Sequence, residues 1–168
     1  KRYGFAQSNI DQLLTDSRSL TFPETTLFFA LKTSSGDGSR YISQLYQRGV
    51  RNFVVSVLPE KYASLYPCSN FLCVQDTLHS LQELACHHRR QFHIPIIAVT
   101  GSNGKTVVKE WLNQILSPTY FVTRSPRSYN SQIGVPLSVW LLDQNSQVGI
   151  FEAGISQVGE MDILRKII

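Results

Sequence analysis

The sequence lacks any long hydrophobic run, and it is sparing in charge. No apolar stretch approaches the roughly 20 residues of a membrane-spanning helix, and Lys1-Arg2-Tyr3-Gly4 is not followed by a signal-peptide core. With 168 residues, 42% of them hydrophobic and 17% charged, the composition is typical of a folded globular protein. We therefore expect a cytoplasmic protein without a membrane span, built as one large or two small domains.

Cysteine is also scarce, with only Cys68, Cys73 and Cys86 present. Their odd number and their spacing fit neither a disulfide framework nor a metal-binding motif, so we expect reduced thiols. The alternative is a zinc site that combines Cys86 with His87, His88 and His93. The Cys86-His87-His88 cluster lies on a polar helical stretch, which argues against a metal there.

The formal net charge is +4. A nucleic-acid-binding protein would show clustered Lys and Arg with interleaved aromatic residues. Here the basic residues are scattered, apart from Arg89-Arg90 and Arg165-Lys166, which look like solvated helix faces. We therefore expect no nucleic-acid partner, and a mild positive charge suits ligands that are phosphorylated anions.

The most informative segment runs from Ile96 to Thr106. Its apolar, β-branched start predicts a buried strand, and the Gly-rich turn that follows opens an amphipathic helix through Leu116. Glycine lets the backbone turn tightly and approach an anion, and the N–H groups at a helix start favour phosphate. Candidate nucleotide-binding residues are Gly101, Ser102, Asn103, Gly104, Lys105 and Thr106. Lys105 can reach the β- and γ-phosphates of ATP, and the Thr106 hydroxyl can ligate Mg²⁺.

This match is to a shortened form of the general P-loop pattern, because Val99 stands where that pattern has its first glycine. A bare Gly-Lys-Thr would be a weak signal, whereas one between a strand and a helix is strong. The alternative is a helix-capping turn in an α/β domain that binds no nucleotide.

The first part of the chain predicts a small α/β domain over residues 1–93. Expected strands cover 26–31, 52–57 and 71–74, and expected helices cover 41–48 and 77–91. Either Asp76 or Thr77 is the expected N-cap of the second helix.

A second domain is expected over residues 94–168, as the start of a P-loop domain with a parallel sheet. Strands are expected at 96–99, 120–123 and 147–151, with helices from the P-loop to 116, near 135–142 and from 159 onward. Glu152 follows the last strand, at the sheet edge where open α/β sheets bind ligands, and is placed to hold Mg²⁺. The alternative is an ordinary strand-end carboxylate that caps the next helix. Three strands with one bare face would be an incomplete domain, so we expect a fragment.

Several spaced motifs resemble those of the Mur ligases, which build the peptidoglycan stem peptide. They are Thr100–Thr106 with Val107-Val108-Lys109-Glu110, Tyr129–Pro136, Glu152-Ala153-Gly154, Thr15-Asp16-Ser17-Arg18, Leu27–Leu31 and Gly36-Asp37-Gly38. The resemblance covers essentially the whole chain. It departs from the family pattern at Ser39, Ser156 and Gln157, to which we transfer no role.

The resemblance implies a UDP-binding first domain and an ATP-binding second domain. It implies that Lys105, Asn130 and Glu152 are catalytic, that Thr106 and Glu152 hold Mg²⁺, and that Ser17 and Arg18 bind the UDP end of the substrate. On the residues alone, Asp16-Ser17-Arg18 reads as a turn with an internal ion pair, and Asn130 as a loop residue that bonds its own backbone.

The implied activity is ATP-dependent amide ligation through an acyl phosphate, with UDP-N-acetylmuramoyl-tripeptide and D-Ala-D-Ala as substrates. The same resemblance raises fusion to an alanine racemase outside this chain. The alternatives are another branch of the family, a nucleotide-binding module with no catalysis of its own, and a P-loop NTPase that drives a partner. No Asp-x-x-Gly switch follows the second strand of the P-loop domain, which disfavours the last.

Overall fold

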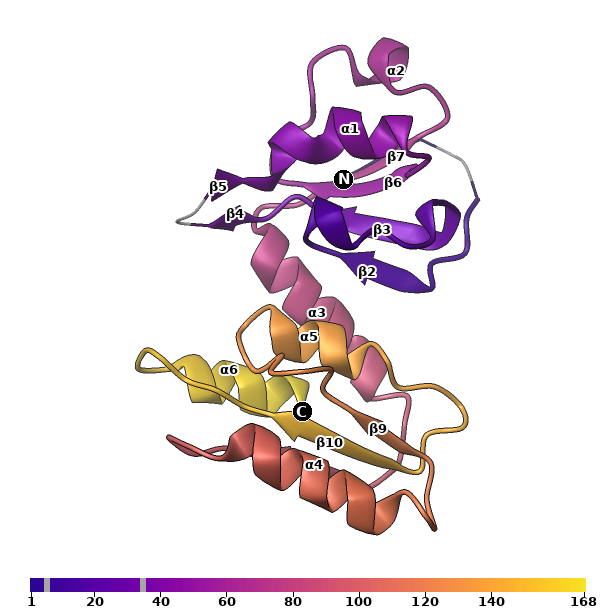
Figure 1. Cartoon of the computed structure of the whole chain (residues 1–168). Coiled ribbons are helices and arrows are strands. Elements are labelled where there is room, and N and C mark those ends of the chain that lie inside the picture. The colour runs from indigo at the N-terminus through magenta and orange to yellow at the C-terminus, as the bar shows by residue number, and fades with distance from the viewer. Residues whose placement is uncertain (5–6, 34–35) are drawn as a thin grey trace. The chain divides into compact units, whose positions relative to one another are not determined.

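The computed structural model describes residues 1–4, 7–33 and 36–168. The chain divides into two compact units, Lys1–Ser80 and Leu81–Ile168 (Figure 1). The functional boundary expected between residues 93 and 94 stays a prediction. In the described part of the chain, no helix is long and apolar enough to cross a membrane.

The first unit is built on a five-stranded sheet in the order β1-β7-β6-β3-β2. Its strands are β1 (Arg2–Tyr3), β2 (Gln12–Leu14), β3 (Thr26–Phe29), β6 (Asn52–Val55) and β7 (Asn70–Cys73). β1 pairs antiparallel with β7, and the other neighbours are parallel. A separate antiparallel pair joins β4 (Lys32–Thr33) and β5 (Gly36–Asp37). Because β2, β3 and β6 are parallel, the loops that follow them emerge at one edge of the sheet.

Two α-helices and three 3₁₀ turns accompany this sheet. They are α1 (Ile42–Gln47), α2 (Tyr62–Leu65), η1 (Ser17–Ser19), η2 (Pro23–Thr25) and η3 (Gly38–Tyr41). Ile42 and Leu45, three positions apart on α1, pack into the core on the sheet. Aromatic rings fill that core: the ring centroids of Phe53 and Phe71 lie 5.1 Å apart in a stacked pair.

Helix α3 (Thr77–Arg89) begins in the first unit and continues in the second. Asp76, one of the two expected N-caps, is the residue that caps it. Its Oδ1 atom accepts hydrogen bonds from the backbone N–H groups of Leu78 and His79 at 2.8 and 3.0 Å. These bonds satisfy two of the donors that a helix start leaves free.

The second unit holds a parallel three-stranded sheet in the order β8-β10-β9. Its elements are β8 (Ile96–Val99), α4 (Lys105–Leu116), β9 (Val122–Arg124), α5 (Gly134–Val139), β10 (Val148–Glu152) and α6 (Glu160–Ile167). β10 lies in the middle, and all five of its residues are buried, as a strand covered on both faces requires.

Helices lie on both faces of this sheet (Figure 1). Val148 and Ile150 pack with Leu112 and Leu116 of α4. Phe151 and Ala153 belong to the core on the other face, together with Val135, Val139, Leu164 and Ile167 of α5 and α6. The expectation of one bare face is therefore wrong, because α5 and α6 return to the face opposite α4.

The main expected elements are present, with shifted ends. The strand expected at 26–31 ends at Phe29, the one at 52–57 ends at Val55, and the helix expected near 135–142 ends at Val139. The strand expected at 120–123 occupies Val122–Arg124. The sequence reading missed β1, β2, β4, β5 and α2, which are two to four residues long and too short to show a period.

We expect Asp76→Ala to lower the free energy of unfolding by about 0.5–2 kcal/mol, because α3 loses its N-cap. Urea unfolding followed by circular dichroism measures the change. Gln44→Ala, on the exposed side of α1, is the matched control and should stay within about 0.5 kcal/mol. Equal effects of the two substitutions would contradict a capping role for Asp76.

Candidate functional site

The loop between β8 and α4 has the backbone geometry of an anion-binding turn. Gly101 and Gly104 adopt φ values of 141° and 76°, which residues with a Cβ atom rarely adopt. A Cβ on Gly104 would meet no heavy atom within 4 Å, so the constraint there is conformational rather than steric. The N-cap of α4 is Gly104, which has no side chain to bond the first N–H groups of the helix, and this leaves them available to an anion.

The two polar side chains at the start of α4 face different partners. The Lys105 ammonium donates a hydrogen bond to the carbonyl oxygen of Gly101 at 2.6 Å, so it lies over the loop. The Thr106 hydroxyl donates to Glu152 Oε2 at 3.2 Å, and its oxygen lies 3.4 Å from Ser128 Oγ. Ser102 and Asn103 are exposed in the loop.

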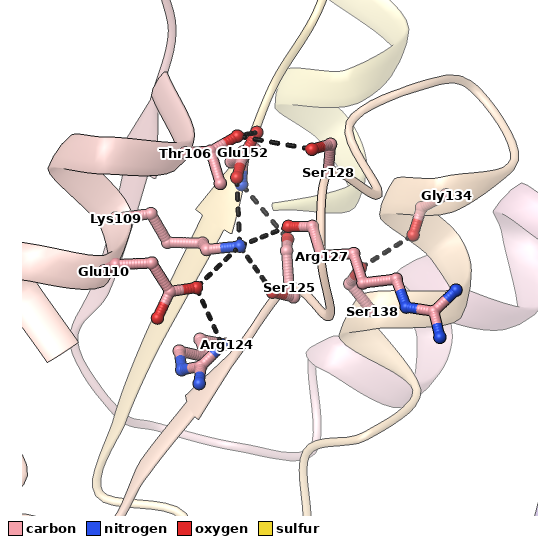
Figure 2. A network of polar contacts seen from close by, with 10 residues as sticks. All are labelled: Thr106, Lys109, Glu110, Arg124, Ser125, Arg127, Ser128, Gly134, Ser138 and Glu152. Atoms are coloured by element: carbon pink, nitrogen blue, oxygen red, sulfur yellow. Dashed lines mark hydrogen bonds and ion pairs between the residues drawn. The ribbon is translucent and has the colours of Figure 1, made fainter. Parts of the chain in front are cut away.

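Glu152 ends β10 with a fully buried side chain. Its backbone N–H donates to Ser125 Oγ at 3.1 Å, and its Oε1 atom lies 3.0 Å from Lys109 Nζ. Figure 2 shows these contacts around the carboxylate. The expected proximity of Glu152 to the P-loop is present, because β10 and β8 are parallel neighbours with Glu152 opposite Val99.

The donors around Glu152 fit a magnesium ion. One carboxylate and the hydroxyls of Thr106 and Ser128 offer oxygen, which Mg²⁺ prefers, and this ion takes its remaining ligands from water and phosphate. Oε2 of Glu152 faces the Thr106 hydroxyl and the P-loop, so this oxygen is the one placed to ligate the ion, while Oε1 faces the Lys109 ammonium. Within residues 1–4, 7–33 and 36–168, no cluster of three or more His, Cys, Asp and Glu side chains is arranged to hold a metal.

Asn130 lies against the segment that follows Glu152. Its carbonyl oxygen accepts a hydrogen bond from the Gly154 N–H at 2.8 Å. A Cβ on Gly154 would stand 2.9 Å from Asn130 Cγ, so this close approach suits glycine. The turn after Asn130 is held by Ser131, whose Oγ accepts from the N–H groups of Ile133 and Gly134.

Ser17 and Arg18 belong to the first unit, in the turn after β2. Ser17 is buried, and its carbonyl oxygen accepts a hydrogen bond from Arg48 Nη1 at 2.7 Å. Arg18 Nη2 lies 2.6 Å from Asp16 Oδ2, while 88% of the Arg18 side chain is exposed. The side-chain hydrogen bonds from Arg18 lower the pKa of Asp16. The internal ion pair that the residues alone suggested is thus present, and an anion can still reach the guanidinium.

A cavity of about 310 Å³ opens where β3 and β6 end. Lys32, Asp37 and Ser39 supply polar groups to its wall, and Lys32 Nζ lies 3.9 Å from Asp37 Oδ2. Motif reading assigned no role to these residues. Their place after parallel strands, at the edge where open α/β sheets bind ligands, is the signal that could have found them.

Lys109 lies in the motif Val107-Val108-Lys109-Glu110, but motif reading gave it no role of its own. It lies three positions after Thr106, on the same side of α4, and this spacing could have identified it. Its ammonium group donates to the backbone carbonyl oxygens of Ser125, at 2.8 Å, and of Arg127.

Comparisons with known proteins show what the chain is similar to. Residues 99–168 match the family described as the Mur ligase middle domain. The segment that begins at the end of β8 is thus similar to a Mur ligase middle domain. The UDP-N-acetylmuramoyl-tripeptide–D-alanyl-D-alanine ligase of Bacillus subtilis is 32% identical, over 97% of this chain and 35% of its own length. The ligase of the same name from Borreliella burgdorferi is 37% identical, over 85% and 32%.

Solved structures of Mur ligases give the same result for the fold. A crystal structure of MurF from Acinetobacter baumannii matches with a TM-score of 0.86 and 31% identity, over 96% of this chain and 34% of that one. MurF from Thermotoga maritima, solved in complex with ADP, matches with a TM-score of 0.77 at 24% identity, over 93% and 35%; this likeness concerns the fold alone. The chain spans about a third of the length of the Mur ligases it matches.

We expect Ser125→Ala to cost about 1–3 kcal/mol of stability, because it removes the acceptor of the buried Glu152 N–H. Chemical denaturation measures the loss. Ser117→Ala, at the exposed end of α4, is the control and should change stability by less than about 0.5 kcal/mol. Equal stability of the two variants would show that the bond to Ser125 contributes nothing.

Proposed function

We propose that the chain is the UDP-substrate- and ATP-binding part of a ligase that joins D-Ala-D-Ala to UDP-N-acetylmuramoyl-tripeptide. The observation that carries the proposal is the contact between Thr106 and buried Glu152 beside Lys105. It occurs in a chain that aligns along 97% of its length with a ligase of that name. The functional division is residues 1–93 for the UDP substrate and residues 94–168 for part of the ATP site.

The reaction has two steps. A carboxylate oxygen of the tripeptide attacks the γ-phosphorus of ATP, the bond to the β,γ-bridging oxygen breaks, and ADP leaves an acyl phosphate. The amine of D-Ala-D-Ala then attacks the acyl carbon, loses its proton and displaces phosphate. ATP is needed because a carboxylate oxygen is a poor leaving group until it is phosphorylated. The first step depends on positioning and charge neutralisation, as in other phosphoryl transfers.

In the second unit, different residues position the phosphates, neutralise their charge and hold the metal ion. The α4 N-terminus and the loop from Gly101 to Gly104 cradle the phosphates, and Lys105 neutralises the β- and γ-oxygens. Thr106 and Glu152 hold Mg²⁺, which when bound neutralises phosphate charge. Asn130, beside the segment that follows Glu152, would contact the γ-phosphate or a water of the bound metal ion.

The first unit receives the UDP end of the substrate. Ser17 reads the uracil or ribose, and the exposed guanidinium of Arg18 lies near the pyrophosphate, which a planar, always-charged group suits. The cavity lined by Lys32, Asp37 and Ser39 lies at the same sheet edge, and it gives the nucleotide an enclosed surface. The reaction belongs to the cytoplasm, and the free thiols Cys68, Cys73 and Cys86 are compatible with a reducing compartment.

A second candidate is a binding module with no catalysis of its own. The observation that favours it is the span of the chain, about a third of its ligase relatives. Under this reading, the 168-residue chain binds its ligands but ligates only as part of the complete protein. Another branch of the family, with a different incoming amino acid, would bind ATP in the same way.

We expect Lys105→Ala in the complete protein to lower kcat for ligation by about 10²–10³-fold, the usual cost of one lost charge-stabilising group. A coupled assay for ADP release measures it. Because Lys105 is only partly buried, the variant should have the same melting temperature as the unsubstituted protein. Lys166→Ala, at an exposed position of α6, is the control. Unchanged ligation by the Lys105 variant would remove this residue from the mechanism.

Calorimetric titration of the chain with UDP-N-acetylmuramoyl-tripeptide, and separately with Mg·ATP, tests the substrate assignment. We expect saturable binding of the UDP ligand and its weakening by about 10-fold or more in Arg18→Ala, since hydrogen bonds to charged groups contribute about 1.5–3 kcal/mol. Arg90→Ala, on exposed surface, should bind normally. Binding of ATP alone would leave a generic P-loop protein, and the peptidoglycan assignment would be withdrawn.

A further inference from the structure

Lys109 is a fully buried cation to which the proposed reaction gives no task. Its ammonium nitrogen lies 3.0 Å from Glu152 Oε1 and 3.3 Å from Glu110 Oε1. It donates hydrogen bonds to the carbonyl oxygens of Ser125 and Arg127. Burying an ammonium group is costly unless it is both paired and hydrogen-bonded. This environment meets both conditions and therefore fixes the group in place.

The pairing with Glu152 balances charge without occupying the carboxylate. Oε1 faces the ammonium, but its geometry is not that of a hydrogen bond. Oε2 accepts the hydrogen bond from Thr106 and is turned toward the P-loop side. One oxygen of the buried carboxylate is thus directed at the place where a divalent cation would lie.

The carbonyl contacts hold the loop after β9. Arg127 adopts φ 48°, a left-handed conformation that residues with a Cβ atom disfavour, and its carbonyl oxygen is one of the two that Lys109 binds. The same loop carries Ser128 and leads to Asn130. Glu110, the second carboxylate beside Lys109, extends the network outward, because its Oε1 atom also lies 3.0 Å from Arg124 Nη1.

Figure 2 shows that Lys109 is the point where three segments meet: α4, the loop after β9 and the end of β10. Each segment carries a proposed site residue, namely Thr106, Asn130 and Glu152. We propose that Lys109 is a positioning residue, which holds Glu152 and the loop after β9 in the geometry that binds the metal–nucleotide complex without touching the nucleotide. This inference rests on the proposed function.

The test separates metal binding from nucleotide binding. The affinity of the chain for ADP is measured by calorimetry, once without metal and once with saturating Mn²⁺. Electron paramagnetic resonance of the Mn²⁺ ion reports which ligands coordinate it. In the unsubstituted chain, Mn²⁺ should tighten ADP binding. In Lys109→Met, we expect metal-free ADP affinity to stay within about 2-fold, while the metal-dependent gain falls by about 10–100-fold, the usual effect of losing a residue that orients a metal ligand.

Control variants make the outcomes distinct. Lys105→Ala should weaken ADP binding with and without metal, and Lys166→Met should change neither. A Lys109→Met variant that keeps the full metal-dependent gain, or that loses both affinities equally, would overturn the positioning role. If the unsubstituted chain binds no ADP at all, the proposed function fails, and the inference fails with it.

Lys109→Met leaves Glu152 buried without its counter-charge, which can prevent folding. A second comparison therefore uses the charge-balanced pair, Lys109→Met with Glu152→Gln, against Glu152→Gln alone. Hydrogen exchange is followed at the amides of Ser125, Tyr129 and Gly154, which bond Ile150, Pro126 and Asn130. We expect faster exchange at these amides in the double variant only. Equal protection in the two variants would overturn the inference.

Discussion

A buried ion pair between Lys109 and Glu152 organises the end of the second sheet. Both side chains are fully buried, so neither charge has bulk water to stabilise it. Burial of either charge is unfavourable without its oppositely charged partner and the surrounding carbonyl and hydroxyl groups. The P-loop helix, the central strand and the loop after β9 are consequently joined at one point. The rest of the proposed ATP site is arranged around that point.

The features that the sequence predicted best are local ones. The loop from Gly101 to Thr106 combines glycines, a lysine and a hydroxyl within a few positions, and the expected role of each depends only on its neighbours in the sequence. The approach of Glu152 to this loop was also predictable, because a general rule of parallel sheets brings strand ends to one edge. The roles given to these side chains stay predictions until they are tested.

What sequence reasoning missed depends on tertiary packing. A lysine inside a helical pattern normally indicates a solvated face. Lys109 is buried instead because the ends of β9 and β10 pack around its side chain, which its neighbours in the sequence do not indicate. The expected bare sheet face was wrong because nothing local indicates that α6 returns to pack on Phe151. The cavity beside Lys32 likewise joins loops that are distant in the sequence. Short strands such as Gln12–Leu14 carry too few residues for a periodic signal.

The Lys109–Glu152 contact also constrains how this site can diverge. Replacing Lys109 alone leaves the buried Glu152 carboxylate without its cation, whereas replacing Glu152 alone leaves the Lys109 ammonium with Glu110 as its remaining carboxylate contact. We therefore expect single changes at this pair to be destabilising. We expect the two positions to be retained together, or replaced together, across related sequences. Ser102 and Asn103 are exposed in the P-loop and lie outside this ion pair, so we expect no covariation between them and Lys109 or Glu152. Covariation of Lys109 and Glu152 would then result from the charge interaction between them and not from a common contact with the nucleotide.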